Sequence, residues 1–551
     1  MAERDRVSPQ MRTAEILDFL HTTPGVFLTN NERDISQSDF MCRIMPQTTL
    51  KVAPYRDATG YFAFEIFGGA TVHMDLIKKQ INPFEKLGLI RKAMPNTLIQ
   101  GLCRGKNLFG YRPYPDNVVE MTIRLLSPYI DIWRMYDCLN YIPNLVVAAR
   151  AVKEAGRLLM PCICFSTGVD HTDDFYVRKV DEVLSLIGDN IILCIKNHSA
   201  LGSPARIAGL VSAIRKRFPG LLIAYHGHNT DGNDLARLVA AVQEGVKVVE
   251  VADHGYGGFY SQAPALTAIQ NLHEYGFKTP GLRIAPILDA SDILRRERRL
   301  YEQFTGPFHG FDPTVKRHKL PGGALSLAME QAEKAGLLER SRELFNELIE
   351  VNRELGNLWV VTPGSQIVWA TAMSNVLNGR YEKPSDDLKR LLLGRYGPFP
   401  FYNPPEWIME KVLESGRTDG KRWQEILADE GGLQDLADED LKSRRLQLES
   451  RLKRPATNEE LCMYLQFPRD ALDFIRFEER FGQTWLLPPE VWFHKGGFAD
   501  GTRISFADET GKTHNIDLIS TRKTEDGVQT SLLVDYHFQT YKTQRGGEEP
   551  A

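Results

Sequence analysis

The sequence predicts an α/β protein that consists of a (β/α)8 TIM barrel, a helical region and a small C-terminal α+β unit with antiparallel strands. Eight apolar runs of strand length recur in the first half of the chain, starting 25 to 36 residues apart. Amphipathic helix-like segments separate them, such as DLARLVAAVQEG at 234–245. Continuous apolar strands that alternate with helices indicate a parallel sheet buried on both faces. Eight such units over roughly 240 residues match the barrel in number and size.

The expected strands follow one another in chain order. They are VFLTN (26–30), YFAFEIF (61–67), TLIQGLCR (97–104), IDIWRMYD (130–137), PCICFS (161–166), IILCIKN (191–197), LLIAYHGH (221–228) and VKVVEVADH (246–254). A doubly wound open sheet is the alternative architecture. Such a sheet usually carries a glycine-rich phosphate loop, and no GxGxxG or P-loop motif follows a strand in this sequence. The barrel is therefore the preferred prediction.

Outside the barrel the pattern changes. From about 280 to 420 the sequence has the spacing of packed helices, and the highly charged stretch 421–455 predicts a solvated helix or linker. A further helical piece leads into alternating residues with Gly and Asp turns at 487–541, which predict a small antiparallel β unit. The expected regions are a polar, helical N-terminal leader (1–25), the barrel domain (26–310), a helical extension with linker (311–455) and a C-terminal region (456–545).

Composition excludes several classes of protein. Of the 551 residues 42% are hydrophobic and 25% charged, and the net charge of −4 favours neither nucleic acid nor an anionic membrane as partner. No apolar run reaches the roughly 18 residues that cross a bilayer, and no signal-peptide pattern opens the chain. The seven cysteines form no CxxC motif and lie mostly in apolar runs, so they predict core residues in a reducing compartment. The expected location is the cytoplasm.

The motif LLIAYHGHNTD at 221–231 is the strongest chemical signal. Side chains alternate along a strand, so His226 and His228 point to the same face at the carboxyl end of a buried strand. Two imidazoles placed in this way suit a divalent metal ion. The alternative is a pair of hydrogen-bonded histidines without a metal.

The other predicted strands also end in polar residues. The strand ends carry Arg33 and Asp34, Glu65, Arg104, Asp137, Ser166, Lys196 and Asp253. Active sites of (β/α)8 barrels lie at the carboxyl ends of the strands, and unpaired buried charge is costly. These residues therefore predict a catalytic metal site on one rim. Structural ion pairs, such as Arg134 with Asp137 or with Glu65, are the alternative interpretation.

Several longer motifs resemble one enzyme family. They are NERDISQS, FGGATVHMD, LCRGKNLFGYRPYPDNVV, WRMYDCLNYIPN, CIKN, HGHNTDG, PGGALSLAMEQ and VTPGSQIV. Together, from about residue 26 to 541, they are similar to the carboxyltransferase domain of pyruvate carboxylase, the alpha subunit of oxaloacetate decarboxylase and the 5S subunit of transcarboxylase.

The resemblance implies a metal site. A zinc, manganese or cobalt ion would be held by Asp34, Lys196, His226 and His228, with Lys196 carbamylated. A lysine beside a cation in a dry site loses its proton more easily, which makes the carbamylation chemically coherent.

The resemblance also implies a substrate site. Arg104 would pair with the carboxylate of a 2-oxo acid in a bidentate geometry, and Gln37 would donate a hydrogen bond to the same substrate. Arg33 is a further candidate for substrate binding. The expected catalytic residues are Arg104, Gln37, Lys196 and Tyr260.

Two positions depart from the family pattern. Tyr260, in HGYGGFYSQAP, stands where the family has a threonine that transfers a proton between pyruvate and biotin. Asn197 stands where the family has aspartate, and His198 follows where an apolar residue is usual. Both changes bear on the use of biotin more than on the metal or the 2-oxo acid.

The expected function is a metal-dependent carboxyltransferase that acts on pyruvate or oxaloacetate through a metal-stabilised enolate. The sequence has no ATP-grasp region before residue 26 and no Ala-Met-Lys-Met biotinyl motif. Biotin, if used, would come from a separate carrier protein served by a biotin carboxylase subunit, and the chain would form a homodimer or a higher oligomer. The alternatives are a biotin-independent oxaloacetate-like decarboxylase or retro-aldol lyase on the same barrel, and a non-enzymatic scaffold subunit.

Overall fold

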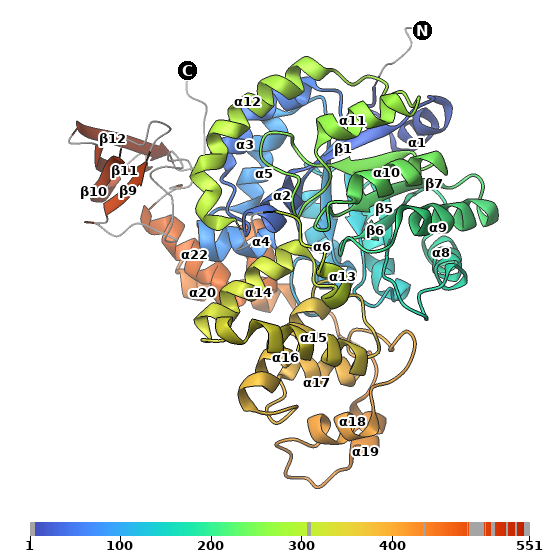
Figure 1. The fold of residues 1–551 in the computed structure, drawn as a ribbon. Coiled ribbons are helices and arrows are strands. Elements are labelled where there is room, and N and C mark those ends of the chain that lie inside the picture. Colours follow the sequence, from blue (N-terminus) through green and yellow to red (C-terminus); the bar gives the residue numbers. More distant parts are fainter. Residues whose placement is uncertain are drawn as a thin grey trace.

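The first half of the chain forms a closed barrel of eight parallel strands, β1 to β8, in which β1 also pairs with β8 (Figure 1). The structure is a computed structural model. It describes residues 6–305, 310–433, 436–481, 483, 501, 503–507, 513–524, 527–534 and 537–544. The closed barrel confirms the predicted fold class.

The observed strands agree closely with the predicted ones. They are β1 (Phe27–Asn31), β2 (Ala63–Gly68), β3 (Leu98–Cys103), β4 (Ile132–Met135), β5 (Leu158–Cys164), β6 (Ile192–Asn197), β7 (Leu222–Gly227) and β8 (Val248–Val251). Every residue in them is buried, as expected for strands covered on both faces. β5 begins three residues earlier than predicted because the apolar run before Pro161 already pairs with β4, with Leu158 opposite Ile132.

Helices follow each strand and surround the barrel. They are α2 (Glu32–Asp39), α3 (Pro46–Ala58), α4 (Thr71–Met74), α5 (Pro83–Ala93), α6 (Asp116–Leu126), α7 (Val146–Glu154), α8 (Asp173–Ile187), α9 (Pro204–Arg217), α10 (Asp234–Gln243) and α11 (Ala265–Glu274). The leader contains α1 (Thr13–Thr22), whose larger apolar side chains are buried. Each barrel helix of ten or more residues presents several buried apolar side chains, so the amphipathic patterns between the strands correspond to real helices.

The helical extension covers the end of the barrel at which the strands finish. Its helices are α13 (Val315–His318), α14 (Gly322–Lys334), α15 (Ser341–Glu354), α16 (Gly364–Asn378), α17 (Asp386–Leu392), α18 (Glu406–Leu413) and α19 (Trp423–Glu430). The preceding helix, α12 (Ile284–Tyr301), lies within the predicted barrel domain and packs against α3. The Tyr136 hydroxyl, just after β4, donates to the carbonyl of Thr362 at 3.0 Å. Lys319 Nζ donates to the carbonyl of Thr167, in the loop after β5, at 2.7 Å. The extension therefore forms a wall over the loops that carry the predicted site.

The charged stretch 421–455 folds as helices rather than as a continuous linker. It contains α19 and α20 (Leu441–Leu452), and α20 buries only Leu448. Two further helices, α21 (Asn458–Gln466) and α22 (Pro468–Phe481), return the chain to the barrel. Residues Thr122 in α6 and Cys462 in α21 lie 3.2 Å apart through Oγ1 and Sγ.

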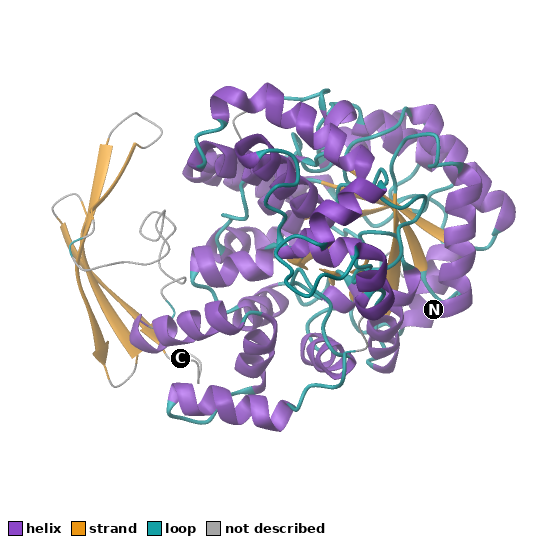
Figure 2. Cartoon of the chain, turned by 90° about the horizontal axis from the view of Figure 1, so that it is seen from below, coloured by secondary structure: helices purple, strands orange, loops and turns teal. Residues whose placement is uncertain are grey.

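The C-terminal strands form the predicted antiparallel sheet, which stands apart from the barrel in Figure 2. Its order is β12 (His537–Gln544), β11 (Gly527–Val534), β10 (Thr513–Thr524) and β9 (Arg503–Ala507). Except for 501, residues 487–502 of the predicted unit lie outside the described part of the chain.

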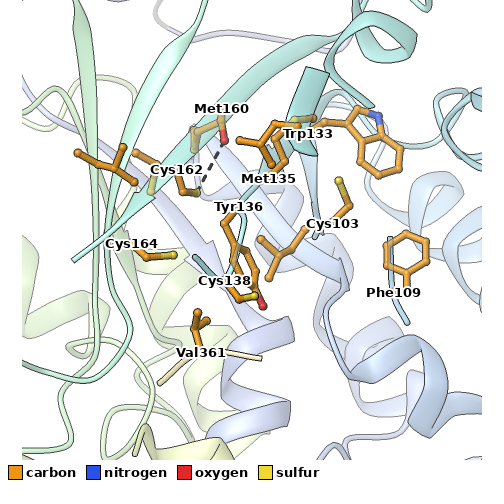
Figure 3. Packing of buried hydrophobic residues seen from close by; sticks show 14 of the residues in the cluster. Cys103, Phe109, Trp133, Met135, Tyr136, Cys138, Met160, Cys162, Cys164 and Val361 are labelled. Atoms are coloured by element: carbon orange, nitrogen blue, oxygen red, sulfur yellow. Dashed lines mark hydrogen bonds between the residues drawn. The ribbon is translucent and has the colours of Figure 1, made fainter. Parts of the chain in front are cut away.

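The seven cysteines are all buried and free. Figure 3 shows Cys103, Cys138, Cys162 and Cys164 among apolar side chains of the core, such as Met135 and Tyr136. This agrees with the prediction that they pack as small hydrophobic residues. No helix in the described part of the chain is both long and apolar enough to span a membrane.

Candidate active site

Asp34, His226 and His228 form a compact buried group at the mouth of the barrel. One ligand atom from each lies within 4.8 Å of the others. His228 Nε2 is 2.9 Å and His226 Nε2 is 3.4 Å from Asp34 Oδ2. Two imidazole nitrogens and a carboxylate oxygen are a donor set that zinc and related ions accept, so the residues fit a metal ion.

The fold places these groups through strand pairing. His226 lies in β7 directly opposite Lys196 in β6, and Lys196 Nζ is 3.1 Å from His226 Nε2. His228 lies two residues beyond His226 and shares its face. Asp34 comes from the first turn of α2, where Asn31 caps its backbone N–H, rather than from a strand end as predicted. All four predicted metal-binding residues are thus brought together.

Burial and neighbouring charges shift the pKa values of this group. Burial opposes ionisation of Asp34, but Arg33 and His228 hold the pKa of this carboxyl well below its usual range. Burial, with the charges of Lys196 and Arg134, keeps the pKa of His226 well below its ordinary value. Burial and the charge of Arg134 also lower the pKa of Lys196. Ionised carboxylate, neutral imidazole and a readily deprotonated lysine are the forms that metal ligation and carbamylation require.

Charged side chains in the barrel interior contact the His226 ring at Nδ1. Glu250, in the middle of β8, lies with Oε2 2.6 Å from His226 Nδ1. Arg134 Nη1 is 2.7 Å from the same nitrogen and donates to Glu250 Oε1 at 2.6 Å. Since only the carboxylate can accept a hydrogen bond from this nitrogen, we assign the Nδ1–H to Glu250, which leaves the Nε2 lone pair facing Asp34 and Lys196. Sequence reasoning missed Glu250, although a single charge within an apolar strand was a visible signal.

Arg33 and Gln37 lie next to this group on α2. Arg33 Nε donates to Glu65 Oε1 at 2.8 Å, and its Nη1 donates to Gln37 Oε1 at 3.1 Å. Arg33 also pairs with Asp34, with Nη2 3.2 Å from Oδ2. Arg33 is therefore held between carboxylates beside the metal-binding group, whereas Gln37 faces the open side of the site.

Arg104 is buried in the loop after β3. Its Nη1 donates to the carbonyls of Phe109 and Gly110, both at 2.7 Å, and its guanidinium lies 5.4 Å from the ring centre of Tyr111. The Arg104 Nε has no hydrogen-bond partner among the described residues. The guanidinium is thus held in one orientation and keeps N–H groups that can donate to a further acceptor.

A cavity of about 780 Å³ opens between the barrel loops and the helical extension. Gln37 and Tyr111 line its barrel side, and residues of α14 and α16 line the opposite side, including Gly323 and Gln366. Asp34, His226, His228 and Arg104 are not themselves among the described residues that line it. The cavity reaches Asp34 through Gln37 and Arg33 on α2, and it reaches Arg104 through Tyr111.

Tyr260 lies in the loop between β8 and α11. Its backbone N–H donates to Asp39 Oδ1 at 2.7 Å, and a side chain at Gly322 would come within 2.3 Å of its Cβ. The residue is buried and is not among the described residues that line the cavity. Burial raises the pKa of its phenol, which stays protonated.

Gln262, two residues further, donates from Nε2 to Asp34 Oδ2 at 2.9 Å. It contacts Asp34 directly, and sequence reasoning missed it. The motif HGYGGFYSQAP did contain it.

Other predicted rim residues do not join the site, which corrects the expectation of a single constellation. Asp253 pairs with Arg56, and Asp137 accepts from the backbone N–H groups of Leu139 and Tyr141. Glu65 pairs with Arg134 at 2.7 Å inside the barrel, as the alternative of structural ion pairs proposed. Buried charges need partners, and these residues find theirs locally.

Ser166 does not join the site either; its backbone N–H and carbonyl both hydrogen-bond the hydroxyl of Tyr176. The two residues after Lys196 have local partners as well. Asn197 Nδ2 donates to the Leu201 carbonyl at 2.8 Å, and His198 Nδ1 lies 3.4 Å from the Lys196 carbonyl oxygen.

Comparison with known proteins identifies the family. A conserved carboxylase domain matches residues 315–517. A pyruvate carboxylase subunit of Methanocaldococcus jannaschii is 31% identical over 387 residues, which are 70% of this chain and 67% of that protein. The methylmalonyl-CoA carboxyltransferase 5S subunit of Propionibacterium freudenreichii is 29% identical and matches over 81% of this chain and 86% of its own length.

The fold agrees with this relationship. The carboxyl transferase domain of Rhizobium etli pyruvate carboxylase, solved with pyruvate and biocytin, superposes with a TM-score of 0.81 at 27% identity, over 97% of this chain and 91% of that one. The chain spans less than half of longer relatives such as pyruvate carboxylase 1 of Caenorhabditis elegans, of which 46% is matched. The predicted resemblance is confirmed, and the chain belongs to the carboxyltransferase family of the pyruvate carboxylases and the transcarboxylase 5S subunit.

Proposed function

We propose that this chain is a carboxyltransferase that moves a carboxyl group to or from a 2-oxo acid, pyruvate or oxaloacetate, through an enolate. The observation that carries this proposal is the convergence of Asp34, Lys196, His226 and His228 beside a cavity that Gln37 lines. The related Rhizobium etli domain was solved with pyruvate and biocytin, which supports a 2-oxo acid as substrate and biotin as the carboxyl carrier.

A divalent ion held by these four residues, with Lys196 as its carbamate, would act as a Lewis acid toward the keto oxygen of the substrate. Zinc, manganese and cobalt all suit the donor set. Glu250 holds the His226 ring in the tautomer that presents Nε2, and Gln262 orients the Asp34 carboxylate through its amide.

Arg104 supplies the charge that binds the substrate carboxylate. Its guanidinium is fixed by the carbonyls of Phe109 and Gly110, so its remaining N–H groups are preorganised for an anion. Gln37 would donate from its amide nitrogen, because its Oε1 already accepts from Arg33. Helices α14 and α16 of the extension line the cavity opposite Gln37 and shield that side from water.

The described residues contain no biotin attachment motif, so biotin would arrive on another chain or domain. A biotin carrier and a biotin carboxylase are accordingly the proposed partners, with a homodimer or higher oligomer as the proposed assembly. Pyruvate carboxylase 1 of Caenorhabditis elegans extends beyond the part that this chain matches.

The experiment incubates the purified chain with oxaloacetate and measures pyruvate, with and without free biotin, after metal analysis. We expect close to one transition-metal ion per chain and metal-dependent release of pyruvate. His226→Ala with His228→Ala should lose both, whereas His273→Ala, an exposed histidine of α11, should keep both. Folded wild-type protein that is metal-free and inert toward both oxaloacetate and pyruvate would refute the proposal.

A further inference from the structure

A chain of three polar side chains crosses the cavity wall. His73, on α4, lies with Nε2 2.8 Å from Asp470 Oδ2 on α22 and with Nδ1 3.3 Å from the Tyr111 hydroxyl, in the loop after β3. All three residues line the cavity together with Gln37. The mechanism above gives no role to His73 or Asp470.

The imidazole of His73 has a fixed orientation. It stacks on the Phe467 ring with a centroid distance of 4.5 Å and an interplanar angle of 4°. The side chain of His73 is 15% exposed and that of Asp470 is 36% exposed. The chain of contacts thus runs from a carboxylate in contact with solvent to a phenol on the wall of the cavity.

The carboxylate determines where the imidazole carries its proton. Asp470 can only accept when ionised, so it holds a proton on His73 Nε2 and leaves Nδ1 facing Tyr111. Neutral His73 accepts the Tyr111 hydroxyl proton at Nδ1, and protonated His73 returns a proton to a phenolate. This is the arrangement by which a carboxylate orients an imidazole toward a hydroxyl in many enzymes.

The surrounding charges favour the same exchange. Burial raises the pKa of Tyr111, so the phenol is protonated at rest, while the Arg104 guanidinium over its ring favours the phenolate. A hydrogen bond from the Gln366 side chain also lowers the pKa of the Tyr111 phenol, whereas the charges of Cys42 and Asp470 raise it. The other charged groups of the cavity wall are paired, Arg112 with Asp387 at 3.5 Å and Arg469 with Asp473 at 3.9 Å.

We propose that Asp470, His73 and Tyr111 form a proton relay that exchanges the C3 proton of the 2-oxo acid with water. This proposal rests on the proposed function. Tyr111 is the catalytic residue, and His73 and Asp470 are positioning residues that act through it. Tyr260, which lies off the described cavity wall, has no part in this exchange.

The step balances without a further reactant. The enolate of pyruvate takes the Tyr111 hydroxyl proton at C3: the O–H bond breaks, a C3–H bond forms from the enolate electron pair, and the C2 carbonyl is restored. His73 reacts as the imidazolium, whose charge Asp470 stabilises: its Nδ1–H bond breaks and gives that proton to the phenolate. The neutral ring keeps its Nε2 proton on Asp470 and takes a new proton at Nδ1 from water in the cavity that it lines. The reverse sequence removes a methyl proton from pyruvate.

The test follows the methyl signal of pyruvate by proton NMR while the full-length chain works in D2O. We expect wild type to replace the methyl protons by deuterium. Tyr111→Phe and His73→Ala should slow the exchange about 10²-fold or more, the range of general acid–base catalysis, with little change in the KM for pyruvate. Asp470→Asn should slow it about 10-fold, and Asp473→Asn, an exposed carboxylate on the same helix, should not.

Two further readouts separate a relay from a structural contact. Added imidazole should restore exchange in His73→Ala, and the inflection of the pH–rate profile that wild type shows should be absent from that variant. Variants that exchange at the wild-type rate would overturn the relay, as would slow variants with an unchanged pH profile and no rescue by imidazole. If wild type neither exchanges pyruvate protons nor decarboxylates oxaloacetate, the proposed function itself fails.

Discussion

Glu250 is a buried residue with two simultaneous contacts, one to His226 and one to Arg134. Its side chain is almost completely inaccessible, so neither contact is weakened by water. An outer carboxylate of this kind fixes the ring orientation of a metal-binding histidine and increases its basicity.

Glu250→Gln should therefore lower metal affinity about 10- to 100-fold and lower the free energy of unfolding by about 3–5 kcal/mol, because Arg134 loses a charged partner. Metal titration and urea denaturation would measure the two effects separately. Glu65→Gln is the matched control: Glu65 also pairs with Arg134 but does not contact His226. Equal loss of metal affinity in both variants would show that Glu250 acts only through stability.

Arg104→Lys tests the substrate site. A lysine ammonium has three N–H donors, so a lysine that donates to the Phe109 and Gly110 carbonyls keeps at most one and cannot pair with a carboxylate in the bidentate geometry. We expect kcat/KM for the 2-oxo acid to fall at least about 10²-fold, in line with about 2–5 kcal/mol for truncating a buried charged pair, with metal content unchanged. Arg150→Lys, on the exposed face of α7, should leave kinetics unaltered. Normal kinetics in Arg104→Lys would assign Arg104 a purely structural role.

At the level of single residues, the residues at the strand ends were predictable and their hydrogen-bond partners were not. His226, His228 and Lys196 follow from residue alternation and from the ends of adjacent strands. Glu250 and Gln262 reach the site through hydrogen bonds whose geometry depends on the register of the closed barrel and on a loop conformation. Asp253 satisfied the same sequence pattern as Asp34 but pairs with Arg56, because α3 places a buried arginine there.

The helix α22 connects the C-terminal region to the barrel. Asp470 reaches His73 near its start, and Glu478 approaches Glu85 on α5 further along. Burial, together with the charge of Glu85, raises the pKa of Glu478 to about 8. Docking of this helix should consequently depend on pH.

Proton binding decides whether the free energy of unfolding rises or falls with pH. The unfolded chain titrates Glu478 at about 4.3, so between that pH and about 8 the folded state holds the extra proton. The stabilisation is complete below the unfolded pKa and is lost as pH rises through about 8, at up to about 1.4 kcal/mol per pH unit. Urea denaturation from pH 5 to 9 should show this decline. Glu478→Gln should flatten it and Asp473→Asn should not; a decline that persists in Glu478→Gln would exclude this carboxyl as the cause.

Element boundaries were predictable where the apolar pattern is regular. The strands and barrel helices match because the alternation of buried strand and amphipathic helix is local. Residues 421–455 were harder, since α19 and α20 bury few side chains and their composition resembles that of a linker.

On the scale of the whole molecule, the barrel and the helices after it share one core. Among the described residues, a single hydrophobic cluster runs from Val7 to Ile475 and includes side chains of α15, α16 and α21. The Tyr114 hydroxyl donates to the Gln466 carbonyl at 2.9 Å, which joins a barrel loop to α21. This long-range packing could not be predicted, because sequence spacing carries no information on which helices cover the barrel mouth.

Removal of residues 456–551 should accordingly destabilise the barrel rather than leave an independent domain. Thermal unfolding should occur at lower temperature, and a dye that binds apolar surface should fluoresce, because the α6 face that contacts Cys462 becomes exposed. Removal of only 503–551 should have a smaller effect. Equal melting temperatures for the full chain and the shorter barrel would contradict the shared core.

The charged interior of the barrel also constrains how this protein can change over generations. Arg134 contacts Glu65, Glu250 and His226 at once, so a single replacement removes a partner from a charge that is buried in the barrel interior. Neutral change at such positions requires paired substitutions, because the effect of one substitution on function depends on whether the other is present. A library that varies Arg134, Glu65 and Glu250 together should recover active combinations whose substitutions are each inactive when made alone.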